Sequence, residues 1–488
     1  MSLTHGLILR GIRSRYLKNK AVVCAVMGYL FLFLGLMAVL SSASICSAVD
    51  SEEYTGKKYG ELRKDKAYNE IYSAFKNFDD IIDVEFSDLT PGNVEKYLTM
   101  VLKDNPELFF IGQGMKYDVN SEGFVSRIYP KYTYTKQAYK SSLEFCEREV
   151  QKIIFLLDSQ MSHYDIALFV HDYLCTHYEY DTSGEGDNMY DFLRSGRGNC
   201  QGYTFTYTYI LRKCGLNVSF AASDSLMHIW NVIELEDKWF HVDVTWDDPV
   251  PDVGGTAMHK YFLFSDLYAQ ELGHNDYYTP GEIMCTSEEY DRKAIENIDT
   301  PLAYFDGKWY CADNTPGGRS FCEYIEKTNC LKPIFRFDSL WKKGDGKYYI
   351  ASFSSTVALG DYIYFNGPEC IYIYDSKNNL TKEFLNTDGR QQIRRLEISG
   401  RELIYYTEDV NDGAQGVSSC MPFYPEMGDI NGDGAVNARD ILHLNLLLDG
   451  NIEEKYYKHS ADFNFDGQID ENDLATFRGF AVDKYSGK

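Results

Sequence analysis

The chain has 488 residues, of which 44% are apolar and 25% are charged. This balance is typical of globular proteins and excludes a largely disordered chain, and a length of this order predicts about three domains. The 48 basic and 73 acidic residues give a formal net charge of −25. Such an acidic chain is a poor partner for nucleic acid or anionic lipid.

The first 48 residues follow the pattern of an export signal. Basic residues between Arg10 and Lys20 precede an uncharged apolar run from Ala21 to Leu40, and small residues follow up to Ala48. This order is typical of a secretory signal. We therefore predict a signal peptide over 1–48 and a secreted protein with no membrane contact after cleavage. Because the apolar run could span a bilayer, an uncleaved anchor is the alternative, and in both cases Val49 onward lies outside the cytoplasm.

Residues 49–135 are predicted to form a helical and mixed lead-in. Apolar residues recur at helical intervals from Tyr54 to Leu102, and Asn105-Pro106 ends that pattern. Alternating apolar residues over 107–135 predict strands. The next predicted elements are helices over Gln137–Leu157 and Asp165–Thr176 and a loop over Gly184–Gly198.

A cysteine stands at the predicted start of the following helix. Gly198-Asn199-Cys200 opens a helix that runs to about Cys214 and stops at Gly215. The positive field at a helix N-terminus favours a thiolate. A thiolate nucleophile also needs a base, which a third group holds in place. Two predicted strands, Met227–Leu235 and Lys238–Thr245, carry candidates for both roles.

The pairing of these two strands brings His228 close to Asp243. With Glu236 and Asp237 as a two-residue turn, His228 faces Thr245, Trp230 faces Asp243, and His228 and Asp243 are diagonal neighbours on one face. A three-residue turn would put them on opposite faces. His241 shares the parity of Asp243 and is a rival base.

Two further sets of residues have alternative interpretations. His171, Cys175 and His177 could suggest a metal site, but only His171 and Cys175 share a helical face and no carboxylate set accompanies them, which favours a packed helix. Trp230 and Trp246 could wall a cleft or simply fill the core.

The ordered set Cys200, His228 and Asp243 resembles the transglutaminase-like superfamily, whose core is papain-like. The resemblance covers about residues 65–265 and includes Asn105-Pro106-Glu107-Leu108-Phe109, Val170-His171-Asp172-Tyr173-Leu174 and Tyr178-Glu179-Tyr180-Asp181. It implies a thiol domain over 136–290 with Cys200 as nucleophile, His228 as base and Asp243 as the residue that orients the base. Members of the family include proteases, peptide N-glycanase relatives, cross-linking enzymes and inactive copies, so the fold alone does not set the reaction.

Three similar segments follow the thiol domain, at 302–310, 359–365 and 398–406. Each places a turn with glycine before an aromatic strand. They look like blades of a propeller, but three copies are too few to close one. We predict a small antiparallel β domain over 298–415 and a linker around Gln415–Pro425.

Two twelve-residue segments near the C-terminus fit a calcium loop. Calcium takes six to eight oxygen ligands, which such a loop supplies from positions 1, 3, 5, 7, 9 and 12, with glycine at position 6. Both loops end in aspartate rather than glutamate, which leaves the denticity at position 12 open. The predicted ligands are Asp429, Asn431, Asp433, the backbone of Ala435, Asn437 and Asp440 in the first loop, and Asp462, Asn464, Asp466, the backbone of Gln468, Asp470 and Asp473 in the second.

The two loops recur at an offset of 33 residues, and each precedes a helix with no helix ahead of it. This arrangement resembles a dockerin module over 427–483. The resemblance implies two bound calcium ions and, as partner, a cohesin module on the scaffolding protein of a cellulosome-type complex. It also implies contacts with cohesin near positions 10 and 11 of each loop, which are Ala438, Arg439, Glu471 and Asn472.

Together these patterns predict a multi-domain α+β protein with a papain-like transglutaminase core, a small antiparallel β domain and a helical calcium-loop dockerin. The predicted function is a secreted cysteine hydrolase that acts on peptide or isopeptide bonds and docks on a scaffoldin. A thioester on Cys200 would pass its acyl group to water in hydrolysis or to lysine in cross-linking. The alternatives are a cross-linking acyl transferase, a non-catalytic adhesion or targeting module that binds through its β domain, and an enzyme acting on glycan-linked asparagine.

Overall fold

In the computed structural model, the described residues run from 65 to 486, with gaps at 182, 184–185, 252–253, 314–318, 344–345, 350–351, 361, 388, 400–401, 421–427, 429, 431–435, 450–460, 462 and 464–468. The predicted signal over 1–48 lies outside them. So do the predicted calcium ligands Asp429, Asn431, Asp433, Ala435, Asp462, Asn464, Asp466 and Gln468. Within the described ranges, no helix has both the length and the apolar character needed to cross a bilayer.

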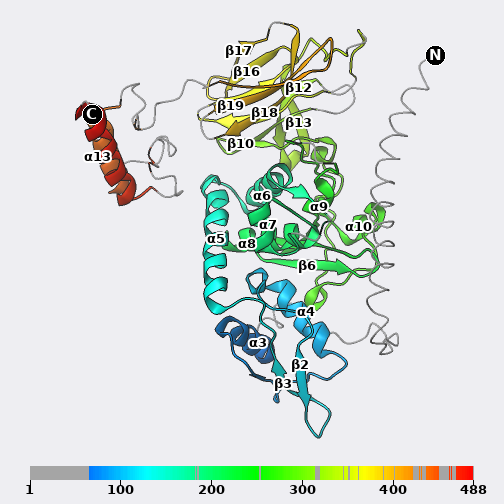
Figure 1. The fold of residues 1–488 in the computed structure, drawn as a ribbon. Coiled ribbons are helices and arrows are strands. Elements are labelled where there is room, and N and C mark those ends of the chain that lie inside the picture. The colour runs from blue at the N-terminus through cyan, green and yellow to red at the C-terminus, as the bar shows by residue number, and fades with distance from the viewer. Residues whose placement is uncertain are drawn as a thin grey trace, which may run out of the picture.

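The lead-in forms a small unit with its own core (Figure 1). In its described part, from residue 65 on, the periodic stretch predicted as helical contains two helices, because the chain leaves the first one at Phe78, whose φ is 64°. Asp65 begins that helix by accepting hydrogen bonds from the backbone N–H groups of Ala67 and Tyr68. The elements are α3 (Lys66–Asn77), α4 (Val94–Asp104), the 3-10 turn η1 (Pro106–Leu108) and a sheet in the order β1 (Ile82–Asp83), β3 (Val125–Tyr129), β2 (Lys116–Val119).

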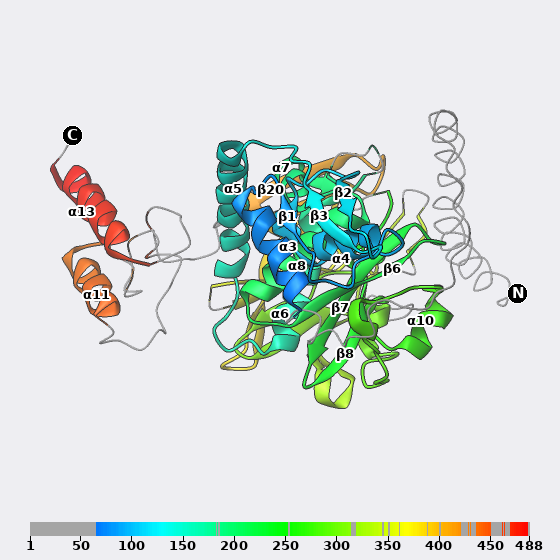
Figure 2. The ribbon, with the colours of Figure 1, turned by 90° about the horizontal axis from the view of Figure 1, so that it is seen from below.

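The thiol domain packs one helix, α8 (Cys200–Lys213), against an antiparallel sheet, and three further helices lie around it: two contact α8 and the last contacts one of these two (Figures 1 and 2). From Gly202 to Thr208 every residue of α8 is buried, as are Ile210 and Leu211, so this helix is enclosed by the domain and contacts β7 on one side. The helices are α5 (Lys136–Phe155), α6 (His163–His177), α7 (Met189–Ser195) and α8 (Cys200–Lys213). The sheet order is β6 (Val218–Ser223), β7 (His228–Leu235), β8 (Lys238–Val242), β9 (Phe262–Phe264). Short elements complete the domain: the parallel pair β4 (Glu179–Tyr180) and β5 (Arg197–Gly198), the helices α9 (Val244–Asp247) and α10 (Asp266–Leu272), and the 3-10 turns η2 (Pro280–Glu282) and η3 (Ala294–Asn297).

The β7–β8 hairpin has the predicted two-residue turn. Leu235 pairs with Lys238 across Glu236 and Asp237, whose φ values of 50° and 61° match a type I′ turn. The second strand was predicted to continue to Thr245, and this is wrong. It ends at Val242, because the Asp243 side chain accepts a hydrogen bond from Trp246 N and so begins the helical turn α9.

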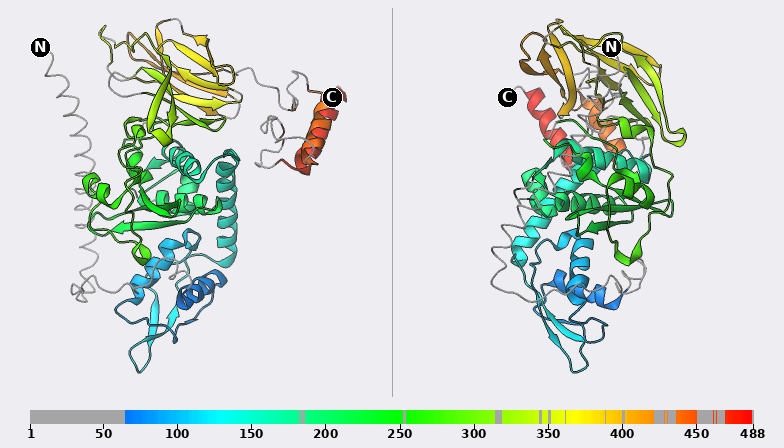
Figure 3. Two further views of the ribbon diagram at one scale, coloured as in Figure 1. Left: turned by 180° about the vertical axis from the view of Figure 1, so that it is seen from behind. Right: turned by 90° about the vertical axis from the view of Figure 1, so that its right-hand side faces the viewer.

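Three antiparallel sheets follow, and each recurring segment forms the first hairpin of one sheet. In both views of Figure 3 these sheets lie at one end of the molecule, the lead-in lies at the other, and the thiol domain lies between them. The strands are β10 (Ala303–Phe305), β11 (Lys308–Ala312), β12 (Ser320–Ile325) and β13 (Cys330–Arg336), with the 3-10 turn η4 (Glu326–Thr328); β14 (Thr356–Leu359), β15 (Tyr362–Asn366), β16 (Cys370–Asp375) and β17 (Leu380–Asn386); and β18 (Gln391–Ser399), β19 (Glu402–Asp409) and β20 (Gln415–Cys420).

The start of the predicted linker is wrong. Residues Gln415–Cys420 form β20, which pairs antiparallel with β19. Serine and glycine in this segment suggested a linker, but a neighbouring strand with open hydrogen-bonding groups can order such a sequence. The remainder of the predicted linker, 421–425, lies outside the described residues.

In the described part of the C-terminal unit, the helices α11 (Ala438–Leu448) and α13 (Glu471–Ser486) lie side by side (Figure 2). Equivalent loop and helix positions share one core, in which Leu444 and Phe477 are fully buried. The internal repeat therefore folds as two similar halves around a common apolar centre.

Candidate active site

Cys200 is the first residue of α8 and is partly exposed. The Asn199 side chain caps the helix by accepting a hydrogen bond from Gln201 N at 2.9 Å. Gly198 has no room for a side chain, because a Cβ there would lie 2.7 Å from a ring carbon of Phe192 and closer still to the Gly186 carbonyl. Cap and glycine together fix the thiol at the positive end of the helix.

His228 is the first residue of β7 and follows Met227, which has the left-handed φ of 49°. Its Nε2 lies 2.7 Å from Asp243 Oδ2. The imidazole also stacks against the indoles of Trp230 and Trp246, at centroid distances of 5.5 Å and 5.2 Å. The ring is therefore held both at its edge and on its faces.

A second histidine, His274, binds the same carboxylate oxygen. Its Nε2 lies 2.8 Å from Asp243 Oδ2, and the side chain is fully buried. Burial lowers the pKa of His274 to about 4, although Asp243 favours the charged form. At neutral pH this ring is uncharged, so it donates one N–H bond and adds no positive charge.

The charges around His228 and its burial shift the pKa of His228 in opposite directions. Burial disfavours the imidazolium, but Asp243 and the Cys200 side chain together outweigh it and raise the pKa of His228 to about 10. Burial would likewise protonate Asp243, yet His228 and His274 hold the pKa of this carboxyl well below its usual range. Because Asp243 occupies Nε2, the other ring nitrogen is the one that can serve Cys200. The three residues predicted from the sequence are thus brought together, and His274 is an addition that the sequence did not indicate.

The rival base His241 forms hydrogen bonds with Trp230 and Asp266. Its Nδ1 lies 3.0 Å from Trp230 Nε1, and its Nε2 lies 3.0 Å from Asp266 Oδ1. Since an indole N–H can only donate, Nδ1 of His241 is the acceptor and Nε2 carries the proton given to Asp266. His241 therefore fixes Trp230, which in turn packs against His228.

The three residues considered as a metal site on α6 do not converge. His171 Nδ1 lies 2.9 Å from Asp172 Oδ1 and its Nε2 lies 3.2 Å from Asp247 Oδ2. In contrast, the Cys175 thiol donates to the Val244 carbonyl, and His177 Nδ1 binds the carbonyl of Tyr173. The three residues therefore do not form one site. The expectation that no carboxylates accompany them is wrong, because Asp172 and Asp247 both contact His171 and the ligand atoms of His171, Asp172 and His259 lie within 4.8 Å of one another.

The buried His171–Asp172 pair extends toward the first of the three sheets. His259 Nε2 lies 2.9 Å from Asp172 Oδ1 and its Nδ1 lies 3.0 Å from the Ile298 carbonyl. Leu302 N donates to Asp172 Oδ2 at 2.8 Å. This buried polar network joins α6 to the chain that enters β10.

The described ends of the two calcium loops close in the same way. Asp440 accepts hydrogen bonds from Ile430 N at 2.9 Å and Asn437 N at 2.8 Å. Asp473 accepts from Phe463 N at 2.7 Å and Asp470 N at 2.8 Å. Both position-12 carboxylates are fully buried, and each ties positions 2 and 9 of its loop together. The predicted cohesin contacts are all exposed at the starts of α11 and α13: Ala438, Arg439, Glu471 and Asn472.

The comparisons with known families match both halves of this description. Residues 155–244, which include Cys200, His228 and Asp243, match the transglutaminase-like superfamily, and residues 427–478 match the dockerin type I domain. The chain therefore combines a transglutaminase-like domain with a C-terminal dockerin type I domain. Domains of the second kind typically bind calcium and imply a cohesin partner.

Curated relatives and solved structures cover smaller parts of the chain. Kyphoscoliosis peptidases of Mus musculus and Homo sapiens are each 28% identical over 117 residues, which is 20% of this chain and 17% of each relative. A TGase crystal structure shares 12% identity over 36% of this chain and 53% of its own, with a TM-score of 0.22. A protein from Cytophaga hutchinsonii, proposed to be a cysteine protease, shares 10% identity over 28% of this chain and 64% of its own, with a TM-score of 0.18. The chain thus spans less than a fifth of the peptidases that it matches.

Proposed function

We propose that this chain is a secreted cysteine hydrolase that acts on peptide or isopeptide bonds through Cys200, His228 and Asp243. The observation that carries the proposal is the 2.7 Å contact between His228 and Asp243, beside a thiol at the start of a helix. A partly exposed cysteine, a base next to it and a buried carboxylate behind the base form the arrangement that nucleophilic catalysis requires.

The chemistry follows from the charges of these groups. The Cys200 thiolate attacks the carbonyl carbon, a C–S bond forms, and the C–N bond breaks as the His228 imidazolium gives its proton to the leaving amine. The neutral imidazole then takes a proton from water as that water attacks the thioester. The C–S bond breaks, the carboxylic acid leaves, and the Cys200 thiolate and the His228 imidazolium are restored. Asp243 stabilises the imidazolium and keeps its ring oriented throughout.

The acceptor of the acyl group decides between hydrolysis and cross-linking. Both reactions use the same thioester, so the two are separated by a product assay on model proteins with and without an added primary amine. We expect new carboxyl groups in the absence of amine and only minor amine incorporation in its presence. Amine incorporation that dominates would instead identify an acyl transferase.

We further propose that the dockerin attaches this enzyme to a cohesin-bearing scaffolding protein outside the cell. The sequence supplies twelve ligand positions in two loops, and the buried, equivalent hydrogen bonds of Asp440 and Asp473 fit two loops closed for the same ion. Calcium would neutralise the carboxylates that each loop gathers. The exposed Arg439 and Glu471 offer opposite charges at equivalent positions to the partner.

A further inference from the structure

The segment that follows Asp243 carries two fully buried carboxylates, Asp247 and Asp248. Asp247 is the last residue of α9, and Asp248 follows it directly. Neither is among the three residues assigned to the reaction. Because burying a carboxylate costs free energy unless it is hydrogen-bonded, the contacts of each one show which parts of the domain it holds together.

Asp247 fixes α9 to the chain just before β9. At the start of the helix, Asp243 N donates to the Tyr261 carbonyl at 2.8 Å, and at its end Asp247 Oδ2 accepts from Tyr261 N at 2.9 Å. His171 Nε2, from α6, lies 3.2 Å from the same carboxylate oxygen. The backbone of Tyr261 therefore holds both ends of α9, and the position of Asp243 depends on that of Asp247.

Asp248 connects the end of α9 to the helix that carries the thiol. The Tyr203 hydroxyl of α8 donates to Asp248 Oδ2, and both side chains are fully buried. Tyr203 lies three residues after Cys200, which is about one helical turn. Its ring packs edge-on against Phe192 at a centroid distance of 4.6 Å. The contact thus joins α8, within one turn of the thiol, to the segment that begins with Asp243.

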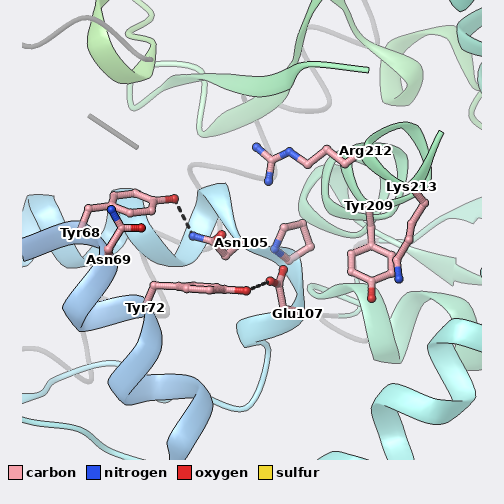
Figure 4. Close-up of a pocket in the computed structure, with 9 residues that line it drawn as sticks. Tyr68, Asn69, Tyr72, Asn105, Glu107, Tyr209, Arg212 and Lys213 are labelled. Atoms are coloured by element: carbon pink, nitrogen blue, oxygen red, sulfur yellow. Dashed lines mark hydrogen bonds between the residues drawn. The ribbon is translucent and has the colours of Figure 1, made fainter. Parts of the chain in front are cut away.

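The other end of α8 is fixed by separate contacts. Arg212 donates to the Asp104 carboxylate at 2.6 Å, beside a pocket of about 290 Å³ between the lead-in and α8 (Figure 4). Tyr209, which also lines this pocket, donates to the Glu147 carboxylate at 2.5 Å. Tyr209 lies nine residues from Cys200, or about 13 Å along the helix axis. This end of the helix therefore has its own anchors, at a distance from the thiol.

We propose that Asp248 is a positioning residue for the proposed reaction. Through Tyr203 it sets the spacing between the Cys200 thiol and the candidate base. The thiol stands on α8, whereas the carboxylate that orients the base stands at the start of α9. A displacement of about 1 Å between groups that react together can slow a reaction by about a hundredfold. The inference rests on the proposed function and deepens it, because it names the residue that holds the two halves of the site in register.

The reactivity of Cys200 toward iodoacetamide reports this spacing without a substrate. At neutral pH a thiol beside an imidazolium is alkylated faster than an isolated thiol, because the positive charge stabilises the thiolate. The experiment uses the full chain and quantifies each cysteine-containing peptide by mass spectrometry. The exposed Cys330 gives the reference rate within the same molecule, and circular dichroism checks that each variant is folded.

Tyr203→Phe should lower the rate at Cys200, relative to Cys330, by about tenfold, because it removes the hydrogen bond to Asp248 and keeps the ring. Tyr209→Phe is the matched control. It removes one tyrosine–carboxylate hydrogen bond from the same helix and should leave the rate at Cys200 unchanged.

Further variants separate position from charge. Asp248→Ala should reproduce the loss of about tenfold, whereas Asp248→Asn keeps an acceptor for the Tyr203 hydroxyl and should retain roughly half or more of the wild-type rate. In the His228→Gln background, Tyr203→Phe should have no further effect, because the base whose spacing it alters is already absent. If Asp248→Ala fails to fold, the tyrosine variants still decide the question.

Three results would overturn the positioning role while the proposed hydrolase would stand. They are equal rates at Cys200 in the wild type and Tyr203→Phe, an equal loss in Tyr209→Phe, and a loss in Asp248→Asn as large as in Asp248→Ala, which would assign the effect to charge. A wild-type Cys200 that reacts no faster than Cys330 would instead contradict the activated thiol, and the proposed function would fall with the role of Asp248.

Discussion

Asp243 accepts hydrogen bonds from two histidine rings on one oxygen and from Trp246 N on the other. Its negative charge is the main source of the raised pKa of His228, which is about 10. The charged form of His228 therefore persists as the pH rises toward that value, and it is lost only above it. The protonation of the candidate base thus depends on a group that substrate need not touch.

Asp243→Asn should lower the pKa of His228 by about one to three units, because the imidazolium loses its counterion. Carbon-13 NMR of labelled histidine, with His228→Gln to assign the signal, measures this directly. A His228 that titrates in the variant as it does in the wild type would contradict the account of the charges. His163→Gln is a suitable control, since His163 is exposed at the start of α6 and its replacement should leave the titration of His228 unchanged.

His274 is predicted to act as a positioning residue. His274→Phe removes one donor to Asp243 and should lower kcat by about tenfold with little change in KM, because a hydrogen bond to a charged group is lost without altering substrate contacts. His274→Gln keeps an N–H donor and should restore most of the activity. The pKa of His228, measured as above, should rise slightly in His274→Phe, which a merely structural role would not produce. Equal losses in both variants would exclude this role.

Two local rules and one resemblance led to the prediction of Cys200, His228 and Asp243. A helix start singled out the thiol and the parity of a hairpin paired His228 with Asp243, while the resemblance to the transglutaminase-like superfamily joined the thiol to that pair. His274 lies 31 residues beyond Asp243, in a loop with no periodicity, and only the folding of that loop over Trp230 and Trp246 brings it in. No local pattern records such a contact.

Among the elements, the β7–β8 hairpin is the one on which the site geometry depends. Its turn residues Glu236 and Asp237 both have positive φ, a conformation that costs a residue with a side chain about 1 kcal/mol or more. The β10–β11 hairpin has the same conformation, with φ values of 50° and 75°, and uses Asp306-Gly307. The two turns therefore form a natural comparison.

Asp237→Gly should raise the free energy of unfolding of the thiol domain by about 1 kcal/mol, because glycine adopts this φ without strain. Chemical denaturation followed by tryptophan fluorescence would measure the change. Gly307→Ala, the reverse substitution in the matched turn, should be destabilising by a similar amount. A neutral or destabilising effect of Asp237→Gly would contradict the turn type.

Element boundaries were less predictable than element types. The second strand of the hairpin stops three residues early because Asp243 caps a helical turn, although the residues after it are aromatic and β-branched. Strand β20 was predicted as linker because its residues are small and polar, and it exists through pairing with β19. In both cases the conformation follows from a specific hydrogen-bonded contact and differs from the one that the local residue types favour.

At the scale of the whole molecule, buried polar contacts join units that the sequence presents as separate. Asp172 binds His259 and Leu302 N and so ties the thiol domain to the first of the three sheets. Asp104 ties the lead-in to α8. Composition and periodicity predicted the units themselves. The contacts between units could not be predicted in this way, because the partners of the Asp104–Arg212 and Asp172–Leu302 contacts are more than a hundred residues apart in the sequence.

Calcium removal should act on the C-terminal unit alone. Chelation should unfold residues 427–483, since each emptied loop gathers carboxylates at a repulsive cost, and should release the chain from a cohesin. Circular dichroism of the full chain and a cohesin pull-down with and without chelator would measure both effects, while alkylation of Cys200 should be unaffected. Asp440→Ala with Asp473→Ala should reproduce the loss in the presence of calcium. Cohesin binding that persists after chelation would show that docking does not require calcium.

In the proposed reaction, Cys200 forms a thioester and passes the acyl group to water. Incubation with model protein substrates in water enriched in oxygen-18, followed by mass spectrometry of the products and of the Cys200 peptide, tests this step. We predict new carboxyl groups with a single heavy oxygen and a trapped acyl adduct on Cys200. In folded Cys200→Ala the rate should fall by about a thousandfold or more. Cleavage by Cys200→Ala at the wild-type rate would show that Cys200 is not the nucleophile.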